Sequence, residues 1–247
     1  MKRCFFTIAD RNNLPYYEIL KNSLAKFTSD PLILIDEEKI RQLGDVNFYY
    51  RATPIVASGL LKQYDAVCKL DSDILILGDL SHIWNEDYDV AVTYNSNPKD
   101  DKLYPVRLLD IHPFSYINAG FMVLKSKVFV EHWLKLCMSD HFQNFQFREQ
   151  DMANLLVYYF SERFGGPYKI KFLDDGSKWH NMRSKGYTPL TKLIDNKVIL
   201  PKNNEWPSDE DKQIVAYHWG GGNNSNKMKY RLIFPSEVIQ FIDTLIK

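Results

Sequence analysis

Two aspartates lie one residue apart inside an apolar part of the chain. The segment CKLDSDILIL carries Asp71 and Asp73, with AVC before the pair and ILIL after it. A carboxylate buried without a partner is costly, so the apolar flanks indicate a nearby positive charge. Hard divalent cations such as Mg²⁺ prefer oxygen ligands, often completed by substrate phosphates. We therefore predict that Asp71 and Asp73 hold a metal ion; a solvated turn is the alternative.

A third candidate ligand lies near the end of the chain. In AYHWGGGNNSNKMKYR, His218 ends an apolar run and is followed by Trp219 and three glycines. Imidazole binds transition ions, and two carboxylates with one imidazole suit Mn²⁺ better than Mg²⁺. Glycines let backbone amides approach a phosphate, and Lys227 or Lys229 could neutralise a pyrophosphate. A core histidine before a loop is the alternative.

Alternating strands and helices must position these residues. Strands are predicted at 3–10, 31–36, 66–71, 73–77, 89–94, 116–124, 170–174, 197–201 and 214–219. Helices are predicted at 14–27, 53–64, from about residue 127, at 148–160 and at 235–247. Short apolar strands alternating with helices predict an α/β fold with a mostly parallel sheet flanked by helices. Ligands bind beyond the carboxyl ends of such strands, where Asp10, Asp71 and Asp73 fall.

The composition excludes several classes of protein. The chain has 247 residues, of which 45% are hydrophobic, and its 31 basic and 31 acidic residues cancel. A general nucleic-acid binder would have a basic excess. The three cysteines are far apart and form no CxxC, which favours reduced thiols.

The N-terminal segment and the last predicted helix indicate where in the cell the protein is expected. The apolar run in MKRCFFTIAD is too short for a signal peptide, so a cytoplasmic protein is expected. The predicted helix at 235–247 has a broad apolar stripe behind the basic segment KMKYR. It could touch a membrane surface, or pack on the core, which is the commoner use of such a stripe.

Four segments in order resemble a known family. CKLDSDILILGDLSHIW, YINAGFMVL, REQDMANLL and YHWGGG resemble the retaining nucleotide-sugar glycosyltransferases of the A-type (GT-A) fold, specifically family 8. Glycogenin and lipopolysaccharide galactosyl- and glucosyltransferases belong to that family. The resemblance runs from residue 3 to about 230. It implies one Rossmann-like domain, 1–247, with a nucleotide-binding half at about 1–115 and a donor-sugar and acceptor half at about 116–247.

The resemblance also implies roles for individual residues. Thr7, Ala9 and Asp10 would contact the base and ribose of a UDP-sugar, with Asp71 also near the ribose. Asn118 and Ala119 would line the donor sugar, and Gly221 would pack against the diphosphate. The metal ligands would be Asp71, Asp73 and His218, holding Mn²⁺ or Mg²⁺.

Two positions depart from the family pattern. Asn224 stands where the family has a lysine, so Lys227 or Lys229 would have to reach the phosphate. Ile55 stands where the family tends to have a basic residue in the helix before the aspartate pair.

The triplet Glu149, Gln150 and Asp151 matches the family's residues around the reacting carbon of the sugar. Retaining glycosidases use a carboxylate nucleophile, whereas Gln150 is a poor nucleophile. The hypothesis is therefore a front-face displacement, in which the Gln150 amide oxygen stabilises positive charge and the flanking acids orient sugar hydroxyls. Acids at a helix N-terminus that merely complement its dipole are the alternative.

Other functions remain as alternatives to a hexosyltransferase acting on a glycan, glycolipid or protein acceptor. A haloacid-dehalogenase-like, Mg²⁺-dependent phosphatase also carries DxD at a strand end, but on its first strand, and here two strands come first. A non-catalytic UDP-sugar-binding protein is the third alternative. The segment WHNMRSKG, around Trp179–Asn181, would line the acceptor side, and a buried tryptophan in a loop is the alternative.

Overall fold

The structure is a computed structural model that describes residues 1–43, 51–95, 115–160, 166–182, 187–202, 210–219 and 233–247. A six-stranded sheet in the order β2-β1-β3-β6-β5-β7 forms its centre. Its strands are β1 (Arg3–Ile8), β2 (Leu32–Ile35), β3 (Ala66–Leu70), β5 (Val90–Tyr94), β6 (Ile117–Leu124) and β7 (Ile170–Phe172).

The central sheet is mostly parallel, as predicted. β1 pairs in parallel with both β2 and β3, and β5 pairs in parallel with β7. β6 runs antiparallel between β3 and β5, and the β5–β6 register shifts between Val92 and Thr93. The inverted strand brings the start of β6 to the edge where β3 ends.

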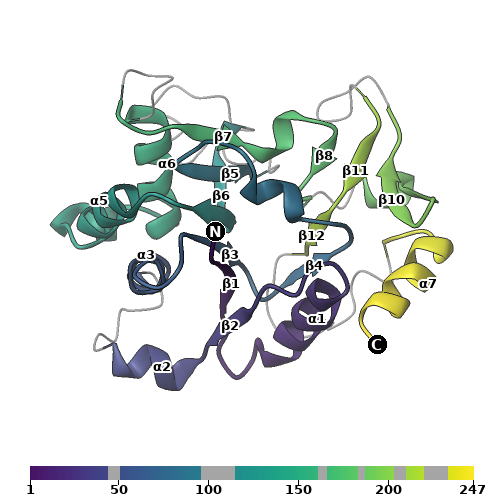
Figure 1. Ribbon diagram of the computed structural model, residues 1–247, viewed down its shortest axis with the longest axis horizontal. Helices are drawn as coiled ribbons and strands as arrows, with labels where there is room; N and C mark the ends of the chain where they lie inside the picture. Colours follow the sequence, from purple (N-terminus) through teal and green to yellow (C-terminus); the bar gives the residue numbers. More distant parts are fainter. Residues whose placement is uncertain (44–50, 96–114, 161–165, 183–186, 203–209, 220–232) are drawn as a thin grey trace.

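Helices cover both faces of this sheet (Figure 1). The helices are α1 (Leu14–Ala25), α2 (Glu37–Gln42), α3 (Ala52–Leu60), α5 (Lys127–Cys137), α6 (Glu149–Tyr159) and α7 (Ser236–Leu245). Successive side chains of β1 point to opposite faces of the sheet. Cys4 and Phe6 pack with residues of α3, α5 and α6, whereas Phe5 packs with residues of α1. This alternation follows from the two-residue period of a strand.

Local sequence explains where the helices begin. Pro15 occupies the first turn of α1, where its missing N–H costs no hydrogen bond. The Asp36 carboxylate accepts from the Lys39 N–H at the start of α2, and the Ser126 hydroxyl accepts from the Phe129 N–H at the start of α5. The predicted helices at 14–27, from 127, at 148–160 and at 235–247 are confirmed within a few residues.

Two smaller sheets correct the predicted strands. The segment 73–77 does not extend β3; it forms β4 (Ile74–Ile76), which pairs antiparallel with β12 (Ala216–His218). The segment 214–219, predicted as one strand, divides at Val215 between β11 and β12. The four-stranded sheet, in the order β8-β11-β10-β9, comprises β8 (Lys178–Trp179), β9 (Lys192–Ile194), β10 (Lys197–Leu200) and β11 (Lys212–Ile214).

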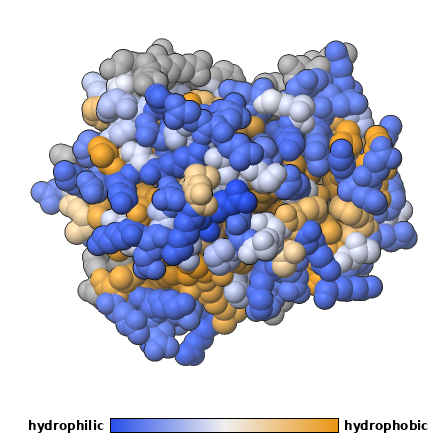
Figure 2. Space-filling model, viewed as in Figure 1, coloured by the Kyte–Doolittle hydropathy of each residue, from blue (hydrophilic) through white to orange (hydrophobic). Residues whose placement is uncertain are grey.

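The C-terminal helix packs on the core with its apolar stripe. Val238, Ile242 and Leu245 are buried in a cluster that also contains Trp179 and Tyr217. Packing on the core, the commoner use of such a stripe, is confirmed, and the alternative of a membrane contact lacks support. Figure 2 shows a largely polar face, with apolar atoms exposed between polar ones. In the described ranges, no helix is both long enough and apolar enough to span a bilayer.

Candidate active site

The structure brings together the three predicted metal ligands, Asp71, Asp73 and His218. The aspartates lie in the turn between β3 and β4, and His218 ends β12, opposite Ile74 in the β4–β12 pairing. His218 Nε2 lies 3.1 Å from Asp73 Oδ1 and 3.5 Å from Asp71 Oδ2. One ligand atom from each residue falls within 4.8 Å of the others. Two carboxylates and an imidazole converging at this spacing suit a divalent transition ion.

Asn181 determines which ring nitrogen of His218 carries the proton and which one faces the aspartates. Its Oδ1 lies 2.9 Å from His218 Nδ1, and its Nδ2 donates to Thr93 Oγ1 at 3.0 Å and to the Tyr94 carbonyl at 3.4 Å. A carbonyl only accepts, so the amide nitrogen must face Tyr94 and the amide oxygen must accept from His218 Nδ1–H. His218 Nε2 is then left as a lone-pair donor facing the two aspartates, which is the arrangement of a metal-binding histidine. The segment around Trp179–Asn181 was predicted to line the acceptor side, and the contact of Asn181 with His218 was not predicted.

Gly120 leaves the space in which the ligands meet. A Cβ at this position would lie 2.4 Å from Asp71 Oδ2, 2.6 Å from Asn118 Oδ1 and 2.7 Å from His218 Cε1. Its carbonyl also accepts from the Asp71 N–H at 2.7 Å. A glycine inside an apolar strand often marks such a close approach. The glycine in YINAGFMVL could therefore have predicted this contact from the sequence.

A buried cation, also missed from the sequence, lies beside the acids. The Lys69 side chain on β3 is only 5% exposed, and its Nζ donates to Asp71 Oδ1. The opposite oxygen of Asp71 faces His218. A lysine in the otherwise apolar strand AVCKL was the available signal, because burying an ammonium group is costly without a partner.

Glu149 is the first residue of α6, and the pKa of its carboxyl group is shifted. Its Oε1 accepts from Thr53 Oγ1 at 2.8 Å, while its Oε2 is buried and has no hydrogen-bond partner among the described residues. Burial raises the pKa of Glu149 to about 7, although the charge of Lys69 and the bond from Thr53 act in the opposite direction. The preceding residue, Arg148, has φ 43°, a backbone conformation that is uncommon for a residue with a side chain.

Gln150 is held at the start of β6. Its Oε1 accepts from the Ala119 N–H at 3.0 Å and from Asn118 Nδ2 at 3.2 Å. Because a backbone N–H can only donate, the amide oxygen must point to Ala119. Both lone pairs of that oxygen are engaged, so Gln150 offers Nε2 to a ligand. This differs from the expected role of the amide oxygen, for the physical reason that the oxygen already has two donors.

Asp151 faces the interior of the protein. It is 0% exposed; its Oδ1 accepts from the Tyr116 hydroxyl at 2.5 Å and its Oδ2 from the Phe147 N–H at 2.8 Å. Burial raises its pKa, and these hydrogen bonds oppose the rise. In this arrangement Asp151 positions the start of α6, instead of orienting sugar hydroxyls as expected, because neither oxygen reaches the surface.

A polar pocket lies beyond the ends of β1 and β2. It has a volume of about 490 Å³ and includes Ala9, Asp10, Asp36 and Arg41 in its lining. Asp10 also accepts from the Asn13 N–H at 2.9 Å, which positions the start of α1. Thr7 is fully buried, and its hydroxyl has no partner among the described residues. The pocket lies where the sequence predicted base and ribose contacts.

Several other predicted positions fall elsewhere. Gly221, Lys227 and Lys229 lie outside the described residues. Trp179 is buried against Tyr187, with ring centroids 6.0 Å apart, which confirms the alternative of a buried tryptophan over that of an acceptor contact.

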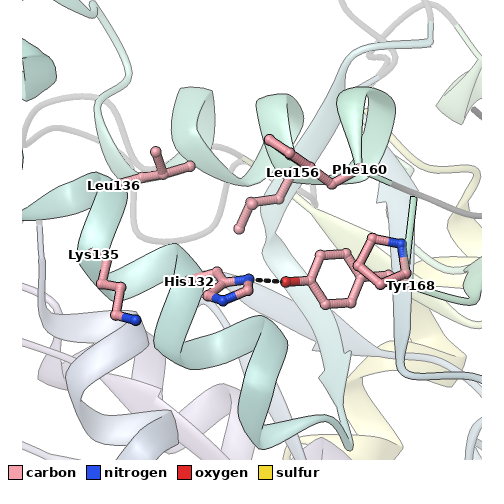
Figure 3. Close-up of a pocket in the computed structure, with 7 residues that line it drawn as sticks. His132, Lys135, Leu136, Leu156, Phe160 and Tyr168 are labelled. Atoms are coloured by element: carbon pink, nitrogen blue, oxygen red, sulfur yellow. Dashed lines mark hydrogen bonds between the residues drawn. The ribbon is translucent and has the colours of Figure 1, made fainter. Parts of the chain in front are cut away.

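A second pocket, of about 300 Å³, lies between α5 and α6 and is largely apolar. Figure 3 shows His132 and the hydroxyl of Tyr168 meeting in a hydrogen bond beneath Leu156. None of the predicted site residues that lie in the described ranges lines this pocket.

Solved structures with a similar fold are glycosyltransferases. The chain is 15% identical to the WbbM bifunctional glycosyltransferase, covering 97% of this chain and 49% of that one, with a TM-score of 0.59. The galactosyltransferase LgtC, in complex with donor and acceptor sugar analogues, is 13% identical over 96% of this chain and 99% of that one, with a TM-score of 0.59. The chain has the fold of GT-A glycosyltransferases.

A third structure agrees. The apo form of the glycosyltransferase GlyE from Streptococcus pneumoniae TIGR4 is 13% identical over 99% of this chain and 63% of that one, with a TM-score of 0.55. The chain thus spans about half the length of WbbM and nearly all of LgtC. No family model matches the chain, and no curated protein matches it by sequence. At these identities the likeness establishes the fold, and membership of family 8 stays a prediction.

Proposed function

We propose that the protein is a glycosyltransferase that moves a hexose from a UDP-sugar to a glycan, glycolipid or protein acceptor, with retention of anomeric configuration. The observation that carries this proposal is the convergence of Asp71, Asp73 and His218 at the end of β3 in a chain with the GT-A fold. The pocket beyond β1 and β2 would take the nucleoside, and the start of α6 would face the sugar.

The donor set and the gap left by Gly120 fit Mn²⁺ or Mg²⁺. Such an ion, held by Asp71, Asp73 and His218, would supply positive charge to the leaving nucleoside diphosphate. The chain itself would provide orientation: Asn181 holds His218 with Nε2 directed at the aspartates. Lys69 adds a second positive charge beside Asp71.

The reaction centre would lie at the start of α6. Gln150, fixed by Ala119 and Asn118, would donate from Nε2 to a sugar oxygen. LgtC has been solved as an active-site mutant in which glutamine is replaced by glutamate, which supports a role for a glutamine in a protein of this fold. Glu149 would bind a sugar hydroxyl near the buried Thr53.

Retention would follow from a front-face displacement. The bond between the sugar carbon and the phosphate oxygen breaks, the acceptor oxygen bonds to the same face of that carbon, and the acceptor's proton passes to the leaving phosphate. NMR of the product tests this step. A product with inverted anomeric configuration would contradict the retaining mechanism and leave the metal site untouched.

The donor and the metal are tested together in a thermal-shift screen of UDP-hexoses with and without Mn²⁺. A ligand that binds only the folded state raises the melting temperature. We expect a UDP-hexose to stabilise the protein more strongly with Mn²⁺ present. Asp73→Asn should abolish the Mn²⁺-dependent part of the shift, because it removes a charged ligand. Asp87→Asn is the matched control, since Asp87 is a surface aspartate paired with Lys169.

Each alternative predicts another result. An unchanged response of the Asp73→Asn variant would contradict the metal assignment. Release of inorganic phosphate from sugar phosphates, without use of UDP-sugars, would favour the phosphatase. Binding of a UDP-sugar without hydrolysis or transfer would favour a non-catalytic binding protein.

A further inference from the structure

Lys69 carries a fixed positive charge inside the candidate metal site. Its strand, β3, is buried at every position, and the Lys69 side chain is 5% exposed. An ammonium group in such a place requires compensation by a carboxylate. The structure supplies this through Asp71, whose Oδ1 accepts from Lys69 Nζ.

The two oxygens of Asp71 therefore face opposite sides of the candidate site. Oδ1 faces Lys69, and Oδ2 lies 3.5 Å from His218 Nε2, on the side where Asp73 Oδ1 also approaches. A divalent ion bound by Asp71, Asp73 and His218 would share Asp71 with the ammonium group. Two cations on one carboxylate repel each other. Lys69 is 5% exposed, so water screens its charge little, whereas the Asp71 side chain is 37% exposed on the side where the ion would bind.

The net charge of the site also indicates that a divalent ion alone would bind weakly. Asp71 and Asp73 contribute two negative charges, and the positive charge of Lys69 offsets part of them while it also acts on the neighbouring Glu149. A site with less net negative charge attracts a divalent ion less strongly. A nucleoside diphosphate brings its own negative charges, which would attract both Lys69 and the ion.

We propose that Lys69 is a built-in counter-cation that weakens binding of the divalent ion alone and strengthens binding of the nucleoside diphosphate. The ion then enters the site effectively only together with the anionic donor. This inference rests on the proposed function, because it assumes that the site binds a divalent ion and a nucleoside diphosphate.

The test measures the affinity of the protein for each ligand in the absence of the other. Mn²⁺ affinity is followed by electron paramagnetic resonance in the absence of nucleotide, and UDP affinity by calorimetry in the presence of chelator. For Lys69→Met we expect Mn²⁺ to bind about tenfold more tightly and UDP about tenfold more weakly. Opposite signs identify an electrostatic role, whereas damage to the structure would weaken both ligands.

Two matched variants control for burial and charge. Lys69→Arg keeps the charge and should leave both affinities close to those of the wild type. Lys212 is also buried, on β11, where its Nζ donates to the Gly176 carbonyl at 2.8 Å. Lys212→Met should therefore change neither affinity, although it too removes a buried ammonium group.

The outcomes separate this inference from the proposed function. If the wild type binds Mn²⁺ and UDP but Lys69→Met weakens both or changes neither, the role of Lys69 is wrong and the metal site stands. If the wild type binds neither ligand, both proposals fail. Should Lys69→Met not fold, the wild type still decides: UDP must raise its Mn²⁺ affinity at least about tenfold, and independent binding of the two would overturn the inference.

Discussion

Gly120 controls the space between the proposed metal-ligating side chains. Any larger residue would place a Cβ within 3 Å of Asp71, Asn118 and His218 at once. Two of these groups are proposed ligands, and Asn118 is held by Gln150. They cannot all move aside without altering the site, so the glycine is required by packing and not by a special backbone angle.

Gly120→Ala is expected to fold but to lose the ion. Overpacking should lower the free energy of unfolding by about 1–3 kcal/mol and reduce Mn²⁺ affinity more than tenfold, since Asp71 and His218 must separate. Chemical denaturation and a Mn²⁺ titration measure the two effects. Gly176→Ala is the control, because nothing lies within 4 Å of a Cβ there. Wild-type Mn²⁺ affinity in Gly120→Ala would contradict the site geometry.

At the scale of elements, a chain of polar side chains holds the segment that carries Asn181. Lys178 Nζ lies 3.1 Å from His82 Nδ1, and His82 Nε2 lies 2.7 Å from His180 Nε2. His180 Nδ1 lies 3.3 Å from Asp174 Oδ1, and the other oxygen of Asp174 accepts from the Tyr94 N–H. An ammonium group only donates, so each bond in the chain runs from Lys178 toward Asp174.

In this direction both ring nitrogens of His82 are engaged, one as acceptor and one as donor. Burial, the neighbouring His180 and the charge of Lys178 lower the pKa of His82 to about 4. An unfolded histidine titrates near 6.5. The stabilising effect of keeping His82 neutral is therefore fully present above about pH 6.5 and is lost as the pH falls through about 4.

His82→Gln should make the protein's stability less sensitive to acid. Between about pH 6.5 and 4, the wild type should lose on the order of 2 kcal/mol of unfolding free energy through this half-exposed group, a value reduced for screening by solvent, and the variant should not. Denaturant unfolding at several pH values measures the difference between the two slopes. Parallel curves for wild type and variant would show that His82 does not titrate in this way.

Elements with a strong local pattern could be predicted from the sequence. The helical spacing of apolar residues located α1, α5 and α7, and the short apolar runs located the strands of the central sheet. The pairing of β4 with β12 could not be predicted, because three-residue strands carry no periodicity and the partners lie far apart in the chain.

The same limit applies to the site. Asp71, Asp73 and His218 were found through residue type and order, and the structure brings them together. Lys69 and the role of Asn181 beside His218 were missed, because the role of a lysine or an amide depends on its neighbours in the folded chain.

At the scale of the molecule, the strand that carries His218 packs in the apolar cluster that also contains the C-terminal helix. Leu75, Trp179, Tyr217 and Ile242 belong to it, so the C-terminal helix helps to hold the strand that ends in His218.

Ile242→Ala should destabilise the whole protein. Ile242 is fully buried, and removing its side chain leaves a cavity that costs about 2–5 kcal/mol. Ile194→Ala is the matched control; Ile194 is 47% exposed on β9, so its loss should change stability by no more than about 0.5 kcal/mol. Equal effects of the two substitutions on chemical denaturation would show that α7 does not pack as described.

The pairing of β12 with β4 has a consequence for biosynthesis. All six strands of the central sheet precede β12 in the chain, so they leave the ribosome before His218 does. A nascent polypeptide can thus assemble its main scaffold while it still lacks the imidazole that completes the triad. If these three residues bind an ion as proposed, a product of premature termination before residue 216 would lack one of the ligands, however well its scaffold forms.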